Sequence, residues 1–215
     1  MLPDDQTLSE QGFDPDAGQG RILLLACGAL AREILHLIKV NGWSHMQLTC
    51  LPANLHLYPD RIPEAVEQAV LKYRDQFDSI FVVYADCGTG GQLLQKCKEL
   101  GVDMVEGPHC YSFFETNEAF AKLSQDECTA FYLTDFLVRQ FDAFVWKPMG
   151  LDKHPDLLHL YFGNYEKLIY QAQTNQPELD AKAAAIAQRM GLRYERRFTG
   201  YGDLETTLQQ VSQTR

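Results

Sequence analysis

The feature that most constrains the fold is a fourfold alternation of short apolar runs with helical segments. The apolar runs cover residues 22–26, 46–51, 79–84 and 102–105. The segments at 30–40, 63–77 and 93–100 repeat apolar residues every three or four positions, as helices with one buried face do. Buried strands that alternate with helices are typical of a parallel sheet covered on both faces. We therefore predict an α/β fold built on a parallel, Rossmann-like sheet.

The second half of the chain is predicted to be more helical. Helical periodicity covers residues 114–123, 134–144, 155–165, 180–190 and 203–211. Two strand-like runs, at 167–171 and 192–198, interrupt these helices. Residues 1–20, by contrast, carry Asp, Gln, Gly and Pro without hydrophobic periodicity, which predicts a flexible N-terminal arm. The remainder, 21–215, is predicted to form a single α/β domain.

Charge and hydropathy narrow the classes of function. The chain has 215 residues and a formal net charge of -10, so its own field repels polyanions such as nucleic acids and anionic membranes. We expect a small-molecule substrate, no nucleic acid and no membrane partner. No apolar run reaches the roughly 20 residues that span a bilayer, and the polar first residues lack the order of a signal peptide. The expected location is cytoplasmic.

The six cysteines divide into two groups. In a chain without an export signal they are better interpreted as free thiols, catalytic groups or metal ligands than as a disulfide framework. Ordinary packing as small apolar residues explains Cys50, Cys97 and Cys128. The other three cysteines lie where a sheet of this kind binds its ligands.

Cys27, Cys87 and Cys110 each follow the end of a predicted strand. In a parallel sheet these ends meet at one rim, beyond which ligands bind. Thiolates suit zinc or an iron–sulfur cluster, and three protein ligands leave one open position on a metal. The spacing alone is weak evidence, since the CxxC signature of structural zinc sites is absent. A metal-free catalytic thiol, or cysteines that only pack, remain alternative interpretations.

Polar groups with catalytic potential flank these cysteines. His109, next to Cys110, and His56, in the loop after the second strand, are candidates for an imidazole ligand or a general base. Asp86 is a candidate for orienting a ligand. Cys87 is predicted to lie at the amino end of a helix, where the helix dipole favours the thiolate.

The glycine-rich segment 86–91 joins a predicted strand to a predicted helix, as phosphate-binding loops do. It matches neither the GxGxxG nor the Walker pattern. The Thr89 hydroxyl and the backbone amides of Gly88, Gly90 and Gly91 are nevertheless candidates for binding a carboxylate or an oxyanion. A simple tight turn is the alternative. Tyr111 and Tyr201, in loops at two other strand ends, are further candidates for substrate contacts.

Five ordered motifs resemble one known family. They are Ala26-Cys-Gly-Ala-Leu30, Tyr84-Ala-Asp-Cys-Gly-Thr-Gly-Gly91, Gly107-Pro-His-Cys-Tyr111, Leu133-Thr-Asp-Phe136 and Tyr161-Phe-Gly-Asn-Tyr165. Together they resemble the prokaryotic domain-of-unknown-function family 1638 over residues 21–208. Members of that family are often encoded beside corrinoid methyltransferase systems, so the resemblance implies a link to one-carbon or methylated-amine metabolism and such a system as partner. It implies no particular reaction.

These observations lead to one main hypothesis and one rival. The main hypothesis is a metal-dependent enzyme, with zinc or an iron–sulfur cluster on Cys27, Cys87 and Cys110, that acts on a small anionic or nitrogen-containing metabolite. Acid–base groups at the site fit hydrolase or lyase chemistry better than hydride transfer, for which no dinucleotide fingerprint is present. The rival is a non-enzymatic metal- or corrinoid-system accessory protein that binds or delivers a ligand with the same cysteines.

Overall fold

The structure, a computed structural model, describes residues 3–14, 21–123 and 127–213. It is a mixed α/β structure with parallel sheets, as the sequence predicted. Contacts divide the chain into two compact units. Unit 1 comprises Met1–Phe113 and Asp203–Arg215, and unit 2 comprises Phe114–Gly202. Within the described residues, no helix combines the length and the apolar character needed to cross a membrane.

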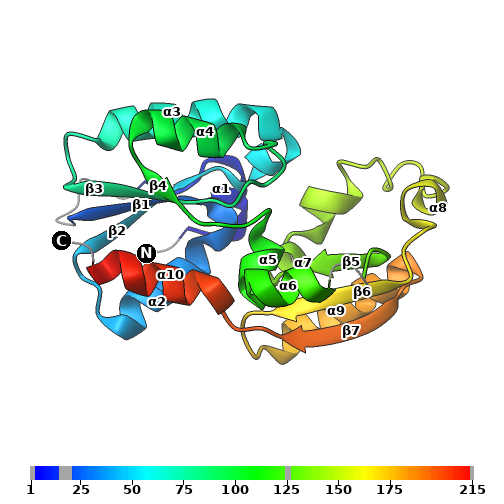
Figure 1. Cartoon of the computed structure of the whole chain (residues 1–215). Coiled ribbons are helices and arrows are strands. Elements are labelled where there is room, and N and C mark those ends of the chain that lie inside the picture. Colours follow the sequence, from blue (N-terminus) through cyan, green and yellow to red (C-terminus); the bar gives the residue numbers. More distant parts are fainter. Residues whose placement is uncertain (1–2, 15–20, 124–126, 214–215) are drawn as a thin grey trace. The chain divides into compact units, whose positions relative to one another are not determined.

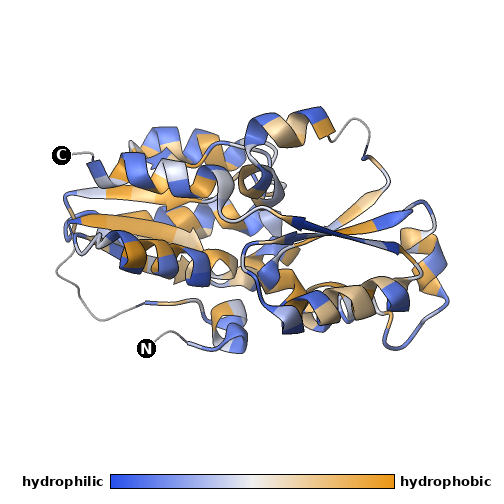
Figure 2. Ribbon diagram, turned by 90° about the horizontal axis from the view of Figure 1, so that it is seen from below, coloured by the Kyte–Doolittle hydropathy of each residue, from blue (hydrophilic) through white to orange (hydrophobic). Residues whose placement is uncertain are grey.

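Unit 1 is built on a four-stranded sheet in the order β2-β1-β3-β4, with every neighbouring pair parallel. The strands are β1 (Ile22–Cys27), β2 (Met46–Leu51), β3 (Ser79–Val83) and β4 (Asp103–Met104). All six residues of β1 are buried, because this strand is central and both of its faces are covered. Figure 2 accordingly shows strands in this sheet as hydrophobic.

Helices cover both faces of the unit 1 sheet. They are α2 (Ala31–Asn41), α3 (Ile62–Tyr73), α4 (Gln92–Leu100) and α10 (Gly202–Gln213). Figure 1 shows α3 and α4 on one face and α2 and α10 on the other. The short helices η1 (Gly28–Leu30), η2 (Ala53–Leu57) and η3 (Pro59–Arg61) lie in the connections after β1 and β2. These strand-to-helix connections leave from the carboxyl ends of the strands, where the predicted site residues other than Tyr201 lie.

The N-terminal segment differs from the expected flexible arm. Residues 5–10 form helix α1 (Asp5–Glu10), and the Asp4 side chain caps it by accepting from the Thr7 amide at 2.8 Å. Leu8 is fully buried, and Phe13 pairs with Cys50 of β2 in an isolated antiparallel bridge. One buried leucine and one bridge thus join residues 3–14 to unit 1. The rest of the predicted arm, 1–2 and 15–20, lies outside the described residues.

Unit 2 contains a second parallel sheet, in the order β5-β6-β7. Its strands are β5 (Ala130–Leu133), β6 (Lys167–Ala172) and β7 (Arg193–Phe198). The helices are α6 (Asn117–Leu123), α7 (Asp135–Arg139), the π-helical turn η4 (Asp142–Trp146), α8 (Leu157–Phe162) and α9 (Pro177–Met190), while α5 (Cys110–Glu115) contains the boundary between the units. Leu168, Tyr170 and Ala172 of β6 pack in one apolar core with residues of α9.

Candidate thiol site at the strand ends of unit 1

Cys27 is the last residue of β1 and is only 2% exposed. Burial raises the pKa of its thiol to about 11, so the group is a neutral thiol at pH 7 in the absence of a charged ligand. Its sulfur accepts a hydrogen bond from the Ala29 amide at 3.4 Å, at the start of η1. A second neighbour is His56 of η2, whose Nδ1 lies 4.0 Å from Cys27 Sγ. Strand β1 and the loop after β2 therefore bring a thiol and an imidazole together.

The loop after β2 borders the neighbouring turn as well. The His56 ring lies 6.4 Å from the Tyr84 ring, measured between centroids. Pro59 of the same loop packs beside Gly88, where an added Cβ would lie 3.5 Å from the proline Cγ. Leu57 and Tyr58, which follow His56, are exposed. This loop thus carries one inward imidazole and two apolar side chains that reach solvent.

Cys87 lies in the turn between β3 and α4, and its backbone φ is 51°. A non-glycine residue in this left-handed region is uncommon and costs energy of order 1–2 kcal/mol. The turn is organised by Asp86, whose carboxylate accepts from the Thr89 hydroxyl at 2.8 Å and from the amides of Gly90 and Gly91 at 3.1 and 2.6 Å. Burial opposes ionisation of Asp86, but these donors outweigh it and lower its pKa.

Backbone hydrogen bonds join the connection after β3 to the connection after β4. The Asp86 amide donates to the Gly107 carbonyl at 3.0 Å, and the Cys87 amide donates to the Pro108 carbonyl at 2.9 Å. Cys110 then begins α5. Burial raises the pKa of the Cys110 thiol, and the nearby thiols of Cys87 and Cys27 raise it further. The structure therefore places all three cysteines near one another at the carboxyl rim of the unit 1 sheet.

As they are placed in the structure, the three thiols do not form a complete set of ligands for one metal ion. Among the residues that the structure describes, no three His, Cys, Asp or Glu side chains are placed to hold a metal ion together. Zinc–sulfur and zinc–nitrogen bonds of about 2.3 and 2.0 Å put two tetrahedral ligand atoms about 3.5 Å apart. The Cys27–His56 separation of 4.0 Å is close to that value. A shared metal would require the side chains of Cys87 and Cys110 to move toward this pair.

Two of the groups predicted to bind substrate are already engaged. The amides of Gly90 and Gly91 donate to the Asp86 carboxylate within the turn. Their contacts are those expected of a simple tight turn, which was the alternative to an anion-binding loop. Both carboxylate oxygens of Asp86 likewise accept hydrogen bonds within this turn. Helix α4 begins at Gln92, with Gly91 as its N-cap, so Cys87 lies outside its first turn, contrary to the expected position at the helix end.

The remaining predicted residues fall in two places. The ring of His109 packs edge-on against Tyr111, with 5.0 Å between centroids. Burial lowers the pKa of His109 and favours its neutral form at pH 7. Both residues belong to unit 1, next to Cys110. Tyr201 belongs to unit 2, where it precedes α10. The structure thus groups His109 and Tyr111 with the cysteine segment and leaves Tyr201 in the other unit.

Tyr84 was given no role by the sequence, yet it lies among the predicted site residues. It follows the last residue of β3, one position beyond the registered pair Ala26 and Val83, so it neighbours Cys27. Burial raises the pKa of Tyr84 well above its usual range, and the thiols of Cys27 and Cys87 add to this effect. Its hydroxyl is close enough to Cys27 to influence that thiol, although no hydrogen bond of normal geometry forms with any described residue.

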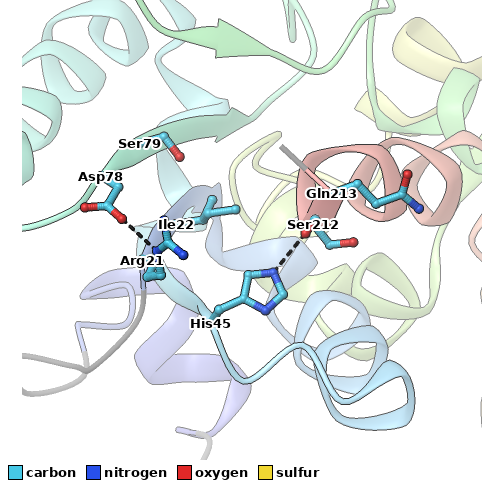
Figure 3. Close-up of a pocket in the computed structure, with 7 residues that line it drawn as sticks. All are labelled: Arg21, Ile22, His45, Asp78, Ser79, Ser212 and Gln213. Atoms are coloured by element: carbon cyan, nitrogen blue, oxygen red, sulfur yellow. Dashed lines mark hydrogen bonds and ion pairs between the residues drawn. The ribbon is translucent and has the colours of Figure 1, made fainter. Parts of the chain in front are cut away.

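The opposite end of the same sheet has a pocket of about 340 Å³ (Figure 3). Its lining residues are Arg21, Ile22, His45, Asp78, Ser79, Ser212 and Gln213. Arg21 and Asp78 form an ion pair at 2.8 Å, and His45 Nε2 lies 3.0 Å from the Ser212 carbonyl. The polar groups that Figure 3 joins by dashed lines are thus paired with one another: Arg21 and Asp78 precede β1 and β3, while His45 precedes β2 and contacts Ser212 of α10. This placement favours the cysteine rim, at the carboxyl ends, as the ligand site.

Fold and site together define an α/β protein with thiols gathered at the carboxyl rim of a parallel sheet. The chain belongs to the family described as "Protein of unknown function (DUF1638)", whose sequence model matches residues 50–208. This match contains His56, Cys87 and Cys110 and begins beyond Cys27. No curated protein and no solved structure matches the chain.

Proposed function

We propose that the protein binds a soft transition-metal centre, zinc or an iron–sulfur cluster, through Cys27, Cys87 and Cys110. With this centre it transforms a small anionic or nitrogen-containing metabolite by hydrolysis or elimination. The observation that carries the proposal is the convergence of three thiols and one imidazole at the rim where parallel α/β sheets bind ligands. Thiolate and imidazole donors are the set that zinc prefers.

Side chains at the site would supply the other groups that this chemistry needs. Cys27 is a buried and Cys110 a half-buried cysteine, and the pKa of each thiol is raised, so a metal must displace their protons when it binds. A metal with an open position supplies Lewis acidity or an activated water. His109, held neutral by burial, is available to accept a proton. The Asp86 turn fixes the backbone around Cys87 and does not take part in proton transfer.

A second candidate function is a non-enzymatic accessory role, in which the same cysteines hold a metal or a corrinoid-system ligand for delivery to a partner. The observation that favours it is the exposure of Leu57 and Tyr58 directly after His56. Apolar side chains in solvent beside a ligand site suit contact with another protein. The partner in this case is a corrinoid methyltransferase system.

The decisive experiment is elemental analysis with optical spectra of the full chain, purified anaerobically and without chelators. We expect a stoichiometric metal in the unmodified protein and its loss in Cys27→Ser, Cys87→Ser and Cys110→Ser. Cys97→Ser is the matched control, because Cys97 is a buried thiol of the same unit on α4. Brown absorbance selects an iron–sulfur cluster over zinc.

Two outcomes overturn the proposal. One is the absence of a stoichiometric metal in the unmodified protein, and the other is full metal content in the three variants. Turnover separates the two candidate functions, since an enzyme transforms a small substrate many times per chain. An accessory protein instead binds its cargo once and passes it on.

A further inference from the structure

The pocket at the amino ends of the unit 1 strands has no part in the proposed function (Figure 3). Three neighbouring strands each bring one polar side chain to it, because Arg21, His45 and Asp78 directly precede β1, β2 and β3. Ile22, the first residue of β1, adds an apolar surface that is 4% exposed. The volume of about 340 Å³ lies in the range of small-molecule pockets. The pocket therefore has the size and the lining of a binding site.

The ion pair in this pocket leaves several of its polar atoms unused. Arg21 Nε donates to Asp78 Oδ2 at 2.8 Å. Within the described part of the chain, the two Nη groups of Arg21 and Oδ1 of Asp78 make no hydrogen bond. The two residues are also held together through the backbone, since the Asp78 amide donates to the Arg21 carbonyl at 2.9 Å. The pair thus presents unused donors with a positive charge beside an unused acceptor with a negative charge.

A ligand that matches this pair carries both charges close together. The two Nη groups of a guanidinium bind a carboxylate through two parallel hydrogen bonds, and a carboxylate oxygen accepts from an ammonium group. A simple anion gains little here, because Asp78 lies 2.8 Å from Arg21 and the chain has a net charge of -10. A simple cation is repelled by Arg21. An α-amino acid, with a carboxylate and an ammonium group on one carbon, meets both requirements.

The last turn of α10 supplies a neutral, polar wall. Figure 3 shows Ser212 and Gln213 on the side of the pocket away from Arg21 and Asp78. The Gln213 side chain makes no hydrogen bond with the described residues. His45 fixes this wall, since its Nε2 donates to the Ser212 carbonyl at 3.0 Å and a carbonyl oxygen can only accept. An amide and a hydroxyl in this place suit a polar, uncharged ligand side chain.

We propose that this pocket binds a small zwitterion of the α-amino acid class, with its carboxylate on the Nη groups of Arg21 and its ammonium group on Asp78. The site is separate from the thiol rim, because Ile22 and Cys27 are the first and last residues of β1. It needs no metal and does not depend on the proposed function. The side chains of Arg21 and Asp78 are 70% and 66% exposed, so the ligand competes with water. We therefore expect a dissociation constant in the high micromolar to millimolar range.

The test is calorimetric titration of the full chain with L-glutamine, which has the zwitterionic head group and an uncharged polar side chain. We expect one molecule to bind per chain. Glutaramate, which lacks the ammonium group, and γ-aminobutyramide, which lacks the carboxylate, should each bind at least about 10-fold more weakly, because each loses hydrogen bonds to a charged group. This comparison separates a zwitterion site from a general anion or cation site.

Two variants locate the binding in this pocket. Arg21→Lys keeps the positive charge next to Asp78 but lacks the pair of parallel donors, so L-glutamine affinity should fall about 10-fold or more. Arg32→Lys is the matched control, because Arg32 Nε donates to Asp5 Oδ1 at the same distance of 2.8 Å, at a place that does not line the pocket. It should bind L-glutamine as the unmodified protein does. Both variants should melt at nearly the unmodified temperature, since exposed ion pairs contribute little stability.

Three results would overturn the proposal. The first is that the folded, unmodified chain binds no L-glutamine at millimolar concentration. The second is equal affinity in Arg21→Lys and Arg32→Lys, which means that L-glutamine binds elsewhere on the chain. The third is that glutaramate or γ-aminobutyramide binds as tightly as L-glutamine, which means that the pocket recognises one charge and not a zwitterion.

Discussion

Cys27 Sγ lies 4.0 Å from His56 Nδ1, which joins the end of β1 to the loop after β2. This separation is close to tetrahedral metal geometry, since zinc ligands of these types lie about 3.5 Å apart. The two residues are far apart in sequence, so only the parallel pairing of β1 with β2 brings them together.

The first prediction concerns His56 as a metal ligand. His56→Ala should lower zinc affinity by at least about 10-fold, because loss of a ligand costs no less than loss of a group that supports one. Competition titration against a chromophoric chelator measures this affinity. His36→Ala, at an exposed histidine of α2, should leave it unchanged. Equal zinc affinity in His56→Ala and the unmodified chain would mean that the imidazole is a proton-transfer group or a packing neighbour.

The second prediction concerns the turn that carries Cys87. Asp86→Ala removes the acceptor for Thr89, Gly90 and Gly91, and hydrogen bonds to a charged group are worth about 1.5–3 kcal/mol. We expect the free energy of unfolding to fall by an amount of this order in urea titrations. Asp75→Ala, at an exposed position after α3, is the control and should be close to neutral. An Asp86→Ala protein as stable as the control would show that the turn does not need its carboxylate.

Much of unit 1 could be predicted from the sequence, because its buried strands are continuous apolar runs with clear ends. The predicted runs at 22–26 and 46–51 match β1 and β2 to within one residue. The same logic failed for β5 (Ala130–Leu133), since its apolar residues run on into those of α7, and the boundary at Thr134 is set by a cap. Without β5, the second sheet and the second unit could not be predicted.

The candidate site was predictable in position but not in its contacts. Parallel strand order places Cys27, Cys87 and Cys110 at one rim, which follows from the sequence pattern alone. Whether the amides of Gly90 and Gly91 face a ligand or Asp86 depends on backbone angles, although an Asp before a glycine-rich turn is a known signal for such bonding. The missing partner of Tyr84 depends on side-chain packing, and no sequence pattern reports it.

The third prediction concerns the close approach of α1 to the rim. A Cβ added at Gly28 would lie 2.4 Å from the Leu8 carbonyl oxygen, so Gly28→Ala must push α1 away or shift η1. We expect a loss of about 1–3 kcal/mol, as for other overpacked sites, and faster cleavage of residues 3–14 by thermolysin. Gly42→Ala is the control: its φ is strained for alanine, at +65°, but its Cβ meets nothing within 4 Å. Equal cleavage of the two variants would contradict the clash.

The last prediction concerns a buried charge network on the sheet of unit 2. Glu127 accepts from Arg197 at 2.9 Å, from Lys167 at 2.7 Å and from the Tyr132 hydroxyl at 2.7 Å. Arg197 also pairs with Glu115 and Glu195, both at 2.6 Å. Burial by itself raises the pKa of Glu127, but the hydrogen bonds from these partners outweigh it and lower the pKa to about 2.

The sign of the pH dependence follows from that lowered pKa. A carboxylate with a depressed folded pKa stabilises the protein above its ordinary pKa, near 4.5, and this stabilisation is lost as the pH falls toward about 2. The full effect is about 3 kcal/mol. We therefore expect the unmodified protein to lose its stability advantage over Glu127→Gln between these two pH values, since the variant cannot ionise at this position.

The pH dependence of stability can be followed in unit 2 alone in a Trp43→Phe variant, because this substitution removes the tryptophan of unit 1. The chain has two tryptophans, and in this background the remaining one is Trp146, which is 8% exposed in the core of unit 2. Urea unfolding followed by its fluorescence compares Trp43→Phe with the double variant that also carries Glu127→Gln. The difference in stability between these two proteins should narrow as the pH falls from about 6 to about 2.5. A difference that stays constant over this range would mean that contacts with Arg197 and Lys167 do not hold Glu127 in its ionised form.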